Sequence, residues 1–278
     1  MPINDELGTR MKEYYEQIPK TKLMRRTPVI IRIDGKAFHT FTNGFKKPFD
    51  EALTKSMQET TKFLCENIQG CVFGYTQSDE ISLVLVDYKK LNSSAWFDYE
   101  IQKMCSVAAS MATMAFNKIF SEEVAKWKNK AFPQDYVYHN TIVNISSEEE
   151  IKLLNKYNQA IEKGAMFDAR CFNIPREEVV NCIYWRQLDA TRNSIQMVGQ
   201  ANFSHKELQE KTCNMIQDML MTEKGINWND FPAYLKRGTA VIKEEYLTEN
   251  DSVRTRWIID LDMPQLKGDD RWYLESLI

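Results

Sequence analysis

The sequence contains no long hydrophobic run. None of its apolar stretches reaches the roughly 18 residues that a membrane-spanning helix needs. Residues 1–22 are polar and charged and lack the apolar segment of a signal peptide. We therefore expect a soluble, cytoplasmic protein with no membrane partner.

The sequence also lacks the cysteine and histidine spacing of a zinc site. None of its six cysteines forms a CxxC pair, and it has only three histidines. A structural zinc ion needs four such ligands at characteristic spacing, so we expect no zinc. The scattered cysteines are typical of small buried residues in a reducing compartment.

An excess of positive charge is absent as well. The formal net charge is −3 and the sequence pI is about 5.8, which argues against a protein that coats DNA. A local cluster of basic residues leaves RNA binding open, and a solvated positive face is the alternative. The cluster comprises Lys20, Lys22, Arg25 and Arg26, with Lys46 and Lys47 further along the chain.

The length and composition allow a substantial core. The chain has 278 residues, 43% of them hydrophobic, and shows no internal repeat, low-complexity tract or linker. We predict one compact domain over residues 1–245, with residues 246–278 as a C-terminal extension packed on it. Trp257 and Trp272 of this extension serve either packing or an RNA contact.

The hydrophobic pattern predicts a recurring order of elements in the first part of the chain. A helix begins after Asp50, a plausible N-cap, and a hairpin turn falls at residues 76–79. The order is a strand at 29–34, a helix at 51–67, strands at 71–75 and 80–87, a helix at 98–119, and a strand at 169–174 or 136–145. This is the split βαβ pattern of ferredoxin-like and polymerase-palm folds. We therefore predict an α/β (α+β) protein, with an antiparallel sheet and helical additions.

Further elements surround this unit. Residues 5–18 are predicted to form a helix with Leu7, Met11 and Tyr14 on one face, and residues 36–49 to form a loop. The remaining predictions are helices at 146–163 and 175–198, an amphipathic helix at 204–221, and strands at 239–245 and 253–262.

Carboxylates stand at the tips of two predicted strands. The strand at 29–34 ends in Asp34-Gly35, and Asp79 lies in the turn before the strand at 80–87. Strand ends on a shared sheet can bring Asp34 and Asp79 together around Mg²⁺, with the Gly35 carbonyl as a further ligand. Two such ions would bridge the attacking and leaving oxygens of a nucleotidyl transfer. Glu80 is predicted to point to the face opposite Asp79, where it either supports the ligands from outside the metal site or serves as an alternate ligand. The alternative is that both segments are ordinary turns.

The residues that follow Gly35 suggest a phosphate site. The backbone N–H groups of residues 36–39 (Lys36, Ala37, Phe38 and His39) can line a triphosphate pocket. The Phe38 ring either stacks on a base or belongs to the core. Lys47, Lys103 and Arg170 are candidate phosphate contacts, with ordinary solvated side chains as the alternative.

Seven segments resemble, in order, the motifs of the tRNA(His) guanylyltransferase family, over roughly residues 28–242. They are Arg32–His39 (RxDGRxFH), Lys47–Asp50 (KPxD), Tyr75–Glu80 (YxQSDE), Trp96-Phe97 with Lys103, Phe167–Arg170 (FDGR), Trp185–Asp189 (WRQxD) and Arg237–Thr239 (RKGT).

The resemblance implies a palm domain that works in the reverse direction. Members add nucleotides to the 5′ end of a tRNA when the 3′-hydroxyl of a nucleoside triphosphate attacks an activated 5′ end. ATP first adenylylates a 5′-monophosphate. By matching position, Asp34, Gly35 and Asp79 would bind Mg²⁺, and residues 34–39 with Ser78 and Asp79 would hold ATP, GTP or another nucleotide. Lys47 and Ser78 would assist activation, and Lys103 and Arg170 would contact phosphates. Members are commonly homotetramers, arranged as dimers of dimers.

One segment departs from the family pattern. Where tRNA(His) guanylyltransferases carry HINNLYN, Thr191 replaces the histidine and Met197 the last asparagine, and only Asn193 coincides. Asp98 and Tyr99 stand where two basic residues are expected. The departure favours the Thg-like branch, whose members repair truncated tRNA by template-directed 3′–5′ addition. The alternatives are G−1 addition to tRNA(His), a palm-fold nucleotide cyclase, and a non-catalytic RNA-binding module.

Overall fold

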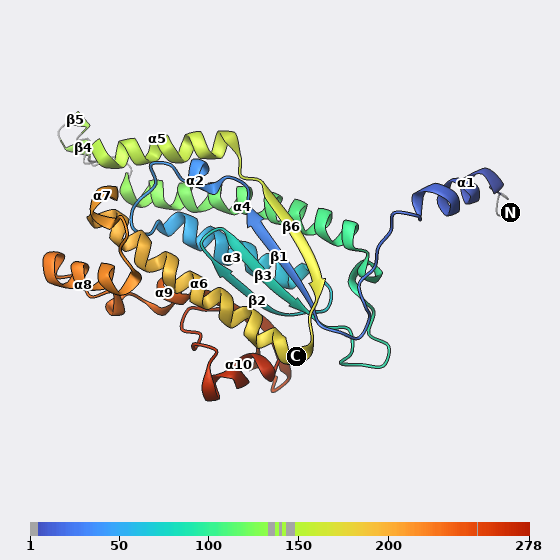
Figure 1. Cartoon of the computed structure of the whole chain (residues 1–278). Coiled ribbons are helices and arrows are strands. Elements are labelled where there is room, and N and C mark those ends of the chain that lie inside the picture. The colour runs from blue at the N-terminus through green and yellow to red at the C-terminus, as the bar shows by residue number, and fades with distance from the viewer. Residues whose placement is uncertain (1–4, 133–136, 139–140, 143–147, 249) are drawn as a thin grey trace.

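The predicted order of strand, helix, hairpin, helix and strand is present in the computed structural model of the chain (Figure 1). The structure describes residues 5–132, 137–138, 141–142, 148–248 and 250–278. Six strands form one sheet in which every neighbouring pair is antiparallel. The spatial order is β6 (Phe167–Asn173), β1 (Val29–Gly35), β3 (Glu80–Leu85), β2 (Cys71–Gln77), β7 (Thr239–Leu247) and β8 (Val253–Asp260). The first four strands have the order of a split βαβ fold, so the predicted palm-like class is confirmed.

One face of the sheet is covered by α3 (Glu51–Asn67) and α4 (Ile101–Ala131). The core on this side contains Ile31 and Ile33 of β1 together with Met57 of α3 and Met104 of α4. At one end it becomes a cluster of aromatic rings whose centroids lie 5.0–5.9 Å apart. The rings belong to Phe38, Phe41, Phe45, Phe116, Phe120, Tyr157 and Phe167.

The opposite face is covered by α6 (Arg176–Asn202) and by the end of the chain, which includes α10 (Trp272–Glu275). Ile30 of β1 and Val180 of α6 are buried here, and Met263 and Leu274 complete the same core. The predicted domain boundary at residue 245 falls inside β7, so it does not coincide with the end of an element. Trp257 is partly buried against the first core, whereas Trp272 is 63% exposed.

Several helices differ from their predicted bounds. The long helix begins at Ile101 and continues to Ala131, and the predicted loop at 36–49 contains the short helix α2 (Phe38–Phe41). The single helix predicted at 204–221 is wrong, because the chain forms α7 (His205–Leu208) and α8 (Cys213–Lys224) with a break between them. The helices α5 (Glu148–Lys163) and α9 (Ala233–Arg237) complete the body.

The final strand of the unit is β6, as the first alternative predicted. Most of the second alternative, residues 136–145, lies outside the described residues. Within it the structure places β4 (Val137–Tyr138) and β5 (Thr141–Ile142), which pair with each other and not with the main sheet.

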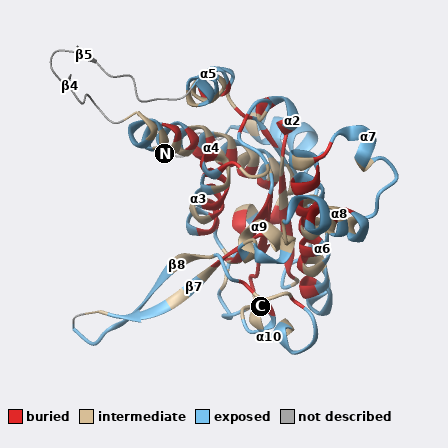
Figure 2. Cartoon of the chain, turned by 90° about the vertical axis from the view of Figure 1, so that its left-hand side faces the viewer, coloured by how far each residue is buried: buried red, intermediate tan, exposed pale blue. Residues whose placement is uncertain are grey.

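Two segments project from the body. The N-terminal arm consists of α1 (Glu6–Met11) and a π-helical stretch, Lys12–Glu16, and stands apart from the sheet and its helices (Figure 1). The β7–β8 hairpin extends away from the body, and its outer half is exposed (Figure 2). In the described part of the chain, no helix combines the length and apolar character needed to cross a membrane.

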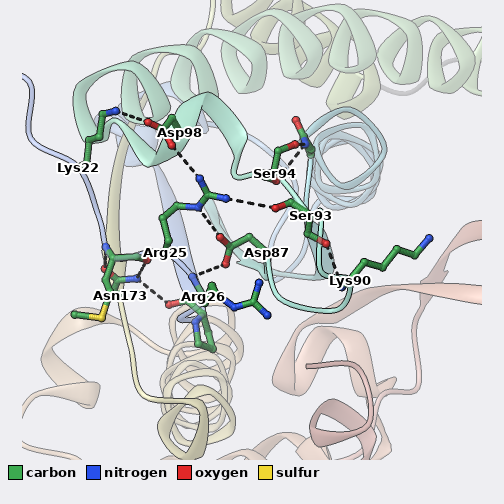
Figure 3. A network of polar contacts seen from close by, with 12 residues as sticks. Lys22, Arg25, Arg26, Asp87, Lys90, Ser93, Ser94, Asp98 and Asn173 are labelled. Atoms are coloured by element: carbon green, nitrogen blue, oxygen red, sulfur yellow. Dashed lines mark hydrogen bonds and ion pairs between the residues drawn. The ribbon is translucent and has the colours of Figure 1, made fainter.

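Two of the four basic side chains before β1, those of Lys22 and Arg25, belong to an ion-pair network (Figure 3). The Arg25 Nε lies 2.7 Å from a carboxylate oxygen of Asp87, and its Nη1 lies 3.0 Å from Asp98. Lys22 pairs with the same Asp98, and the backbone N–H of Arg26 donates to Asp87 at 2.8 Å. Lys22 and Arg25 therefore tie the chain before β1 to the loop before α4, which favours a structural role over RNA binding.

Candidate active site

Main-chain atoms join the two segments that carry Asp34 and Asp79. The backbone N–H of Gly35, at the end of β1, donates to the carbonyl oxygen of Asp79 at 3.1 Å. The two carboxylates are close enough to interact: the pKa of Asp79 is raised, first by burial and further by the negative charge of Asp34. The Ser78 hydroxyl, which donates to Asp79 at 3.0 Å, and His39 act in the opposite direction. The structure thus places Asp34, Ser78 and Asp79 in one group.

The turn that presents Asp79 is tight. Gln77 and Glu80 are paired across β2 and β3, so Ser78 and Asp79 are the two residues of the hairpin loop. Ser78 has φ of +51°, a conformation that costs a residue with a Cβ roughly 1–2 kcal/mol. Such strained backbone positions concentrate at functional sites, which supports a functional role for this turn.

Gly35 is required by the aromatic core. A Cβ at this position would lie 2.2 Å from a ring carbon of Phe38. The Phe38 ring is buried against Phe41, Phe116 and Phe167, so the core alternative for its side chain is the one observed. Phe38 can contribute only its backbone to a nucleotide site.

The turn after Gly35 leaves main-chain donors free. The N–H of Lys36 donates to the carbonyl of Met166 at 2.8 Å and is therefore occupied. Among the described residues, the N–H groups of Ala37, Phe38 and His39 have no backbone or side-chain acceptor. Ala37 has φ of +53° and His39 is exposed, so this turn directly after β1 has consecutive amides that an anion can accept from.

A polar row crosses the sheet at this end. Asp34 lies directly opposite Glu80 on β3 and opposite Asp168 on β6, and Glu80 lies opposite Gln77 on β2. Residues opposite one another in antiparallel strands share a face, with Cβ atoms about 5 Å apart. Asp168, which belongs to the motif Phe167–Arg170 but had no predicted role, is therefore an acidic neighbour of Asp34.

Of the two roles predicted for Glu80, the structure favours support from outside the metal site over direct ligation. Its two carboxylate oxygens accept hydrogen bonds from Nε and Nη2 of Arg186, each at 2.7 Å, and both side chains are buried. Burial raises the pKa of Glu80, and the Arg186 charge opposes that shift. Because this carboxylate is committed to Arg186, Glu80 orients the start of β3 and is not available to a metal ion.

The ion pair continues along α6. Arg186 also donates to Asp189 at 2.8 Å, and Asp189 accepts from Arg192 at 2.7 Å. The guanidinium of Arg186 lies 4.5 Å from the ring centroid of Trp185, and that of Arg32 lies 5.1 Å from the same centroid. The motif Trp185–Asp189 was recognised in the sequence, but its connection to Glu80, 106 positions away, depends on the tertiary fold.

Two of the predicted phosphate contacts, Arg170 and Lys47, lie on separate elements. Arg170 is exposed on β6, opposite Arg32, and its guanidinium lies 3.1 Å from Asp168. Lys47 is exposed in the loop before α3, in a hollow that Met197 and Gln200 of α6 also line.

Lys103 is not brought to this group. It lies in the first turn of α4, ten positions before Thr113, which accepts from the N–H of Phe167 beside Gly35. Ten helical residues span about 15 Å, and α4 covers the face opposite Asp34. The Lys103 ammonium lies 4.8 Å from the ring centroid of Phe97.

A cavity opens beside the β2–β3 turn. Its walls come from α3, the β2–β3 turn, α6 and α9, and they include Gln77, Ser78, Asn193 and Met197. The segment that departs from the HINNLYN pattern therefore lies within reach of Ser78.

An antiparallel palm-like sheet that brings two carboxylates together at one end fits a domain of the nucleotidyl-transferring class. The sequence matches the family described as tRNAHis guanylyltransferase over residues 8–175. The chain belongs to that family.

The similarity extends to solved structures and to named relatives. A bacterial tRNA(His) guanylyltransferase-like protein in complex with ATP is 41% identical, with a TM-score of 0.76 and 98% of each chain covered. A second structure of a bacterial tRNA(His) guanylyltransferase-like protein, in complex with GTP, is 39% identical with a TM-score of 0.72 and covers 98% of this chain and 99% of the other. The tRNA(His) guanylyltransferase of Debaryomyces hansenii is 26% identical over 259 residues, which cover 88% of this chain and 84% of that protein.

Proposed function

We propose that the chain is a Mg²⁺-dependent nucleotidyltransferase that adds nucleotides to the 5′ end of truncated tRNA in the 3′–5′ direction. The observation that carries the proposal is the pairing of Asp34 with Asp79 through the bond between Gly35 and the Asp79 carbonyl. A 5′-monophosphate first attacks ATP and releases pyrophosphate. The 3′-hydroxyl of the incoming nucleotide then attacks the adenylylated end and releases AMP.

The group fits a magnesium site of the kind that substrates complete. No cluster of three or more histidine, cysteine or acidic side chains suited to a metal exists in the described part of the chain. Mg²⁺ usually takes only one or two carboxylates, with phosphates and water as its other ligands. Asp34, Asp79 and the Gly35 carbonyl would hold it. Bound there, one or two ions would neutralise the charge that develops at the reacting phosphate.

The remaining residues of the site would bind and orient the nucleotide. The free N–H groups of Ala37, Phe38 and His39 can receive a triphosphate, and the ATP and GTP complexes of the related bacterial protein support this assignment. Ser78, at the tip of the hairpin, and the exposed Lys47 would assist activation of the 5′ end. Arg170 would contact a phosphate from β6. A phosphate contact by Lys103 stays a prediction, because within one chain Lys103 lies against Phe97 and away from Asp34 and Asp79.

Template-directed addition is the form of the reaction that this sequence favours. Thr191 and Met197 replace polar residues of the HINNLYN pattern, and Met197 lines the cavity beside Ser78. Base pairing would then choose the nucleotide in place of a side-chain pocket. G−1 addition to tRNA(His) is the second candidate, because the curated relatives carry that name.

We also propose a cytoplasmic homotetramer, arranged as a dimer of dimers. The N-terminal arm presents Leu7, Met11, Tyr14 and Tyr15 to solvent, with Leu7 and Tyr14 each 60% exposed. Apolar residues at helical spacing on a projecting segment are suited to burial against a second copy of the chain.

The test uses a tRNA that lacks its first nucleotide and carries a labelled 5′-phosphate. With ATP, all four nucleoside triphosphates and Mg²⁺, we expect a product lengthened by the complement of the unpaired acceptor nucleotide. Asp79→Ala should reduce the rate at least about 100-fold, and the matched exposed control Asp269→Ala should leave it unchanged. Absence of a lengthened product, or full activity in Asp79→Ala, contradicts the proposal.

Changing the acceptor nucleotide separates the two forms of addition. Incorporation of G whatever the template supports G−1 addition over repair. Conversion of ATP or GTP alone to a cyclic product would identify a cyclase, which needs no RNA. Absence of Mg²⁺-dependent nucleotide binding in calorimetry would identify a non-catalytic RNA-binding module.

A further inference from the structure

A large aromatic side chain is exposed on α6 close to the paired carboxylates. Trp185 is 51% exposed, and Leu188 and Arg192 follow it at helical spacing on the same side of the helix. Trp185 precedes Arg186, which holds Glu80 in the polar row at the end of the sheet. An exposed tryptophan at this place has no role in either hydrophobic core of the sheet.

Most of the arginines around Trp185 are paired with carboxylates, but one is not. Arg186 is bound to Glu80 and Asp189, Arg192 to Asp189, and Arg170 to Asp168. Arg32, in contrast, forms no ion pair within the described residues. Its guanidinium lies 5.1 Å from the centroid of the Trp185 ring, and its charge also acts on Glu80, which Arg186 already binds. An unpaired guanidinium on an exposed indole leaves both groups available to a ligand.

The position of these groups relative to the reaction centre is fixed by β1. Arg32 and Asp34 are two positions apart on the strand, so they share a face and are separated by about 7 Å. Arg170 lies opposite Arg32 on the edge strand β6. A chain of nucleotides that reaches Asp34 along this face would pass Trp185 and both arginines.

We infer that Trp185, together with Arg32 and Arg170, forms a stacking platform for an RNA end, with one base on the indole and the adjoining phosphates on the two arginines. Sequence-tolerant binding of single-stranded or terminal nucleotides depends on aromatic stacking combined with positive charge. A platform of this kind suits a substrate whose terminal base varies. The inference rests on the proposed function, because it assigns the RNA-binding surface of that same site.

The experiment compares the affinity of the full-length chain and its variants for the 5′-truncated tRNA, without nucleoside triphosphates. Trp185→Ala and Trp185→Leu should each raise the Kd roughly 5- to 100-fold, since alanine substitution of a stacking residue has effects of this size. Trp185→Leu keeps an apolar cover over Arg186, so it remains informative if Trp185→Ala is unstable. Trp185→Phe should stay within about threefold of the wild type, because it retains a ring.

Trp272→Ala is the matched control, since Trp272 is 63% exposed on α10 and lies outside the platform. Its affinity for tRNA should not change. In steady-state assays, Trp185→Leu should raise the KM for tRNA and leave the KM for the incoming nucleotide unchanged. A structural defect would instead lower the melting temperature and change both values.

Unchanged tRNA affinity in Trp185→Ala and Trp185→Leu overturns the inference, and so does a selective loss of ATP affinity. The outcomes for the two proposals are distinguishable. If the wild type binds tRNA without lengthening it, the proposed reaction fails while the affinity comparison still decides the role of Trp185. If the wild type does not bind tRNA at all, both fail.

Discussion

Asp79 occupies a position that disfavours its own charge. Burial and the neighbouring Asp34 both raise its pKa, and only the Ser78 hydroxyl, its own backbone and His39 oppose them. Two adjacent carboxylates that repel each other destabilise the fold in the absence of a cation. The arrangement of Asp34 and Asp79 therefore lowers the stability of the fold, which is expected of residues with the binding role proposed for them.

Replacing Asp79 by asparagine should stabilise the metal-free chain. A raised pKa means that the fold loses stability as the pH rises above the ordinary aspartate value of 3.8 and through the folded value. Asp79→Asn removes this loss, so at pH 7 in EDTA we expect a melting temperature about 2 °C higher, with activity abolished. Near pH 3 the difference should disappear. A lower melting temperature at pH 7, with no change in the control Asp269→Asn, would contradict this account.

Residues of the candidate site could be predicted only where a pattern in the neighbouring sequence marks them. Asp34, Gly35, Ser78 and Asp79 adjoin strand ends that hydrophobic pattern reveals. The commitment of Glu80 to Arg186 and the pairing of Asp34 with Asp168 join positions more than 100 residues apart, and no local pattern encodes them. Phe38 was ambiguous because an aromatic residue after a turn suits a base and a core equally well.

At the scale of elements, the start of α3 is determined by one buried carboxylate. Asp50 accepts from the N–H of Leu53 at 3.0 Å, from the N–H of Lys46 at 3.1 Å and from the hydroxyl of Tyr157 at 2.7 Å. It thus caps α3, closes the loop that carries Lys47, and joins both to α5. Burial and the Asp50 charge raise the pKa of Tyr157, which keeps this hydroxyl a donor.

Removing these contacts should have graded effects. Asp50→Ala loses the helix cap and leaves the buried Tyr157 hydroxyl unpaired, so we expect a loss of about 2–4 kcal/mol in the free energy of unfolding. Tyr157→Phe should cost only about 1 kcal/mol, since Asp50 keeps two backbone donors. Urea titration measures both. Equal losses in the two variants would show that capping contributes little.

The same capping rules explain one success and one failure of sequence reasoning. Asp50, interpreted as an N-cap, predicted the first residue of α3 correctly. The region 204–221 was interpreted as one helix from its apolar spacing, yet Ser204 forms a capping box with Glu207, and Thr212 accepts from the N–H of Met215 at 3.3 Å. Two caps within nine residues divide the segment, and this signal was present in the sequence.

At the scale of the whole molecule, two segments of the described chain that expose apolar side chains project from the body. The N-terminal arm exposes Leu7 and Tyr14, and the tip of the β7–β8 hairpin exposes Leu247 and Val253 (Figure 2). The split βαβ body was predictable because its elements alternate in a fixed order. The placement of α6 and the C-terminal segment over the second face was not, because apolar periodicity does not specify which face a helix covers.

The assembly proposal predicts that the N-terminal arm controls oligomeric state. Serine at Leu7, Met11 and Tyr14 together should reduce the mass in solution from four chains to a smaller number, because the variant removes apolar surface that a partner would bury. Light scattering after size-exclusion chromatography gives the mass directly. The control Leu91→Ser changes a residue that is 95% exposed in a loop and should have no effect. An unchanged mass in the triple variant excludes the arm as the contact.

The hydrogen bond between Gly35 and Asp79 has a consequence for how this protein can diversify. It is formed entirely by main-chain atoms, so the spacing that it imposes on the two acidic residues needs no particular side-chain functional group. Trp185, Thr191 and Met197, in contrast, all belong to one helix and can vary together. Under the proposed function, the dimensions of the reaction centre and the choice of substrate are encoded in separate stretches of polypeptide, and one can evolve while the other stays constant.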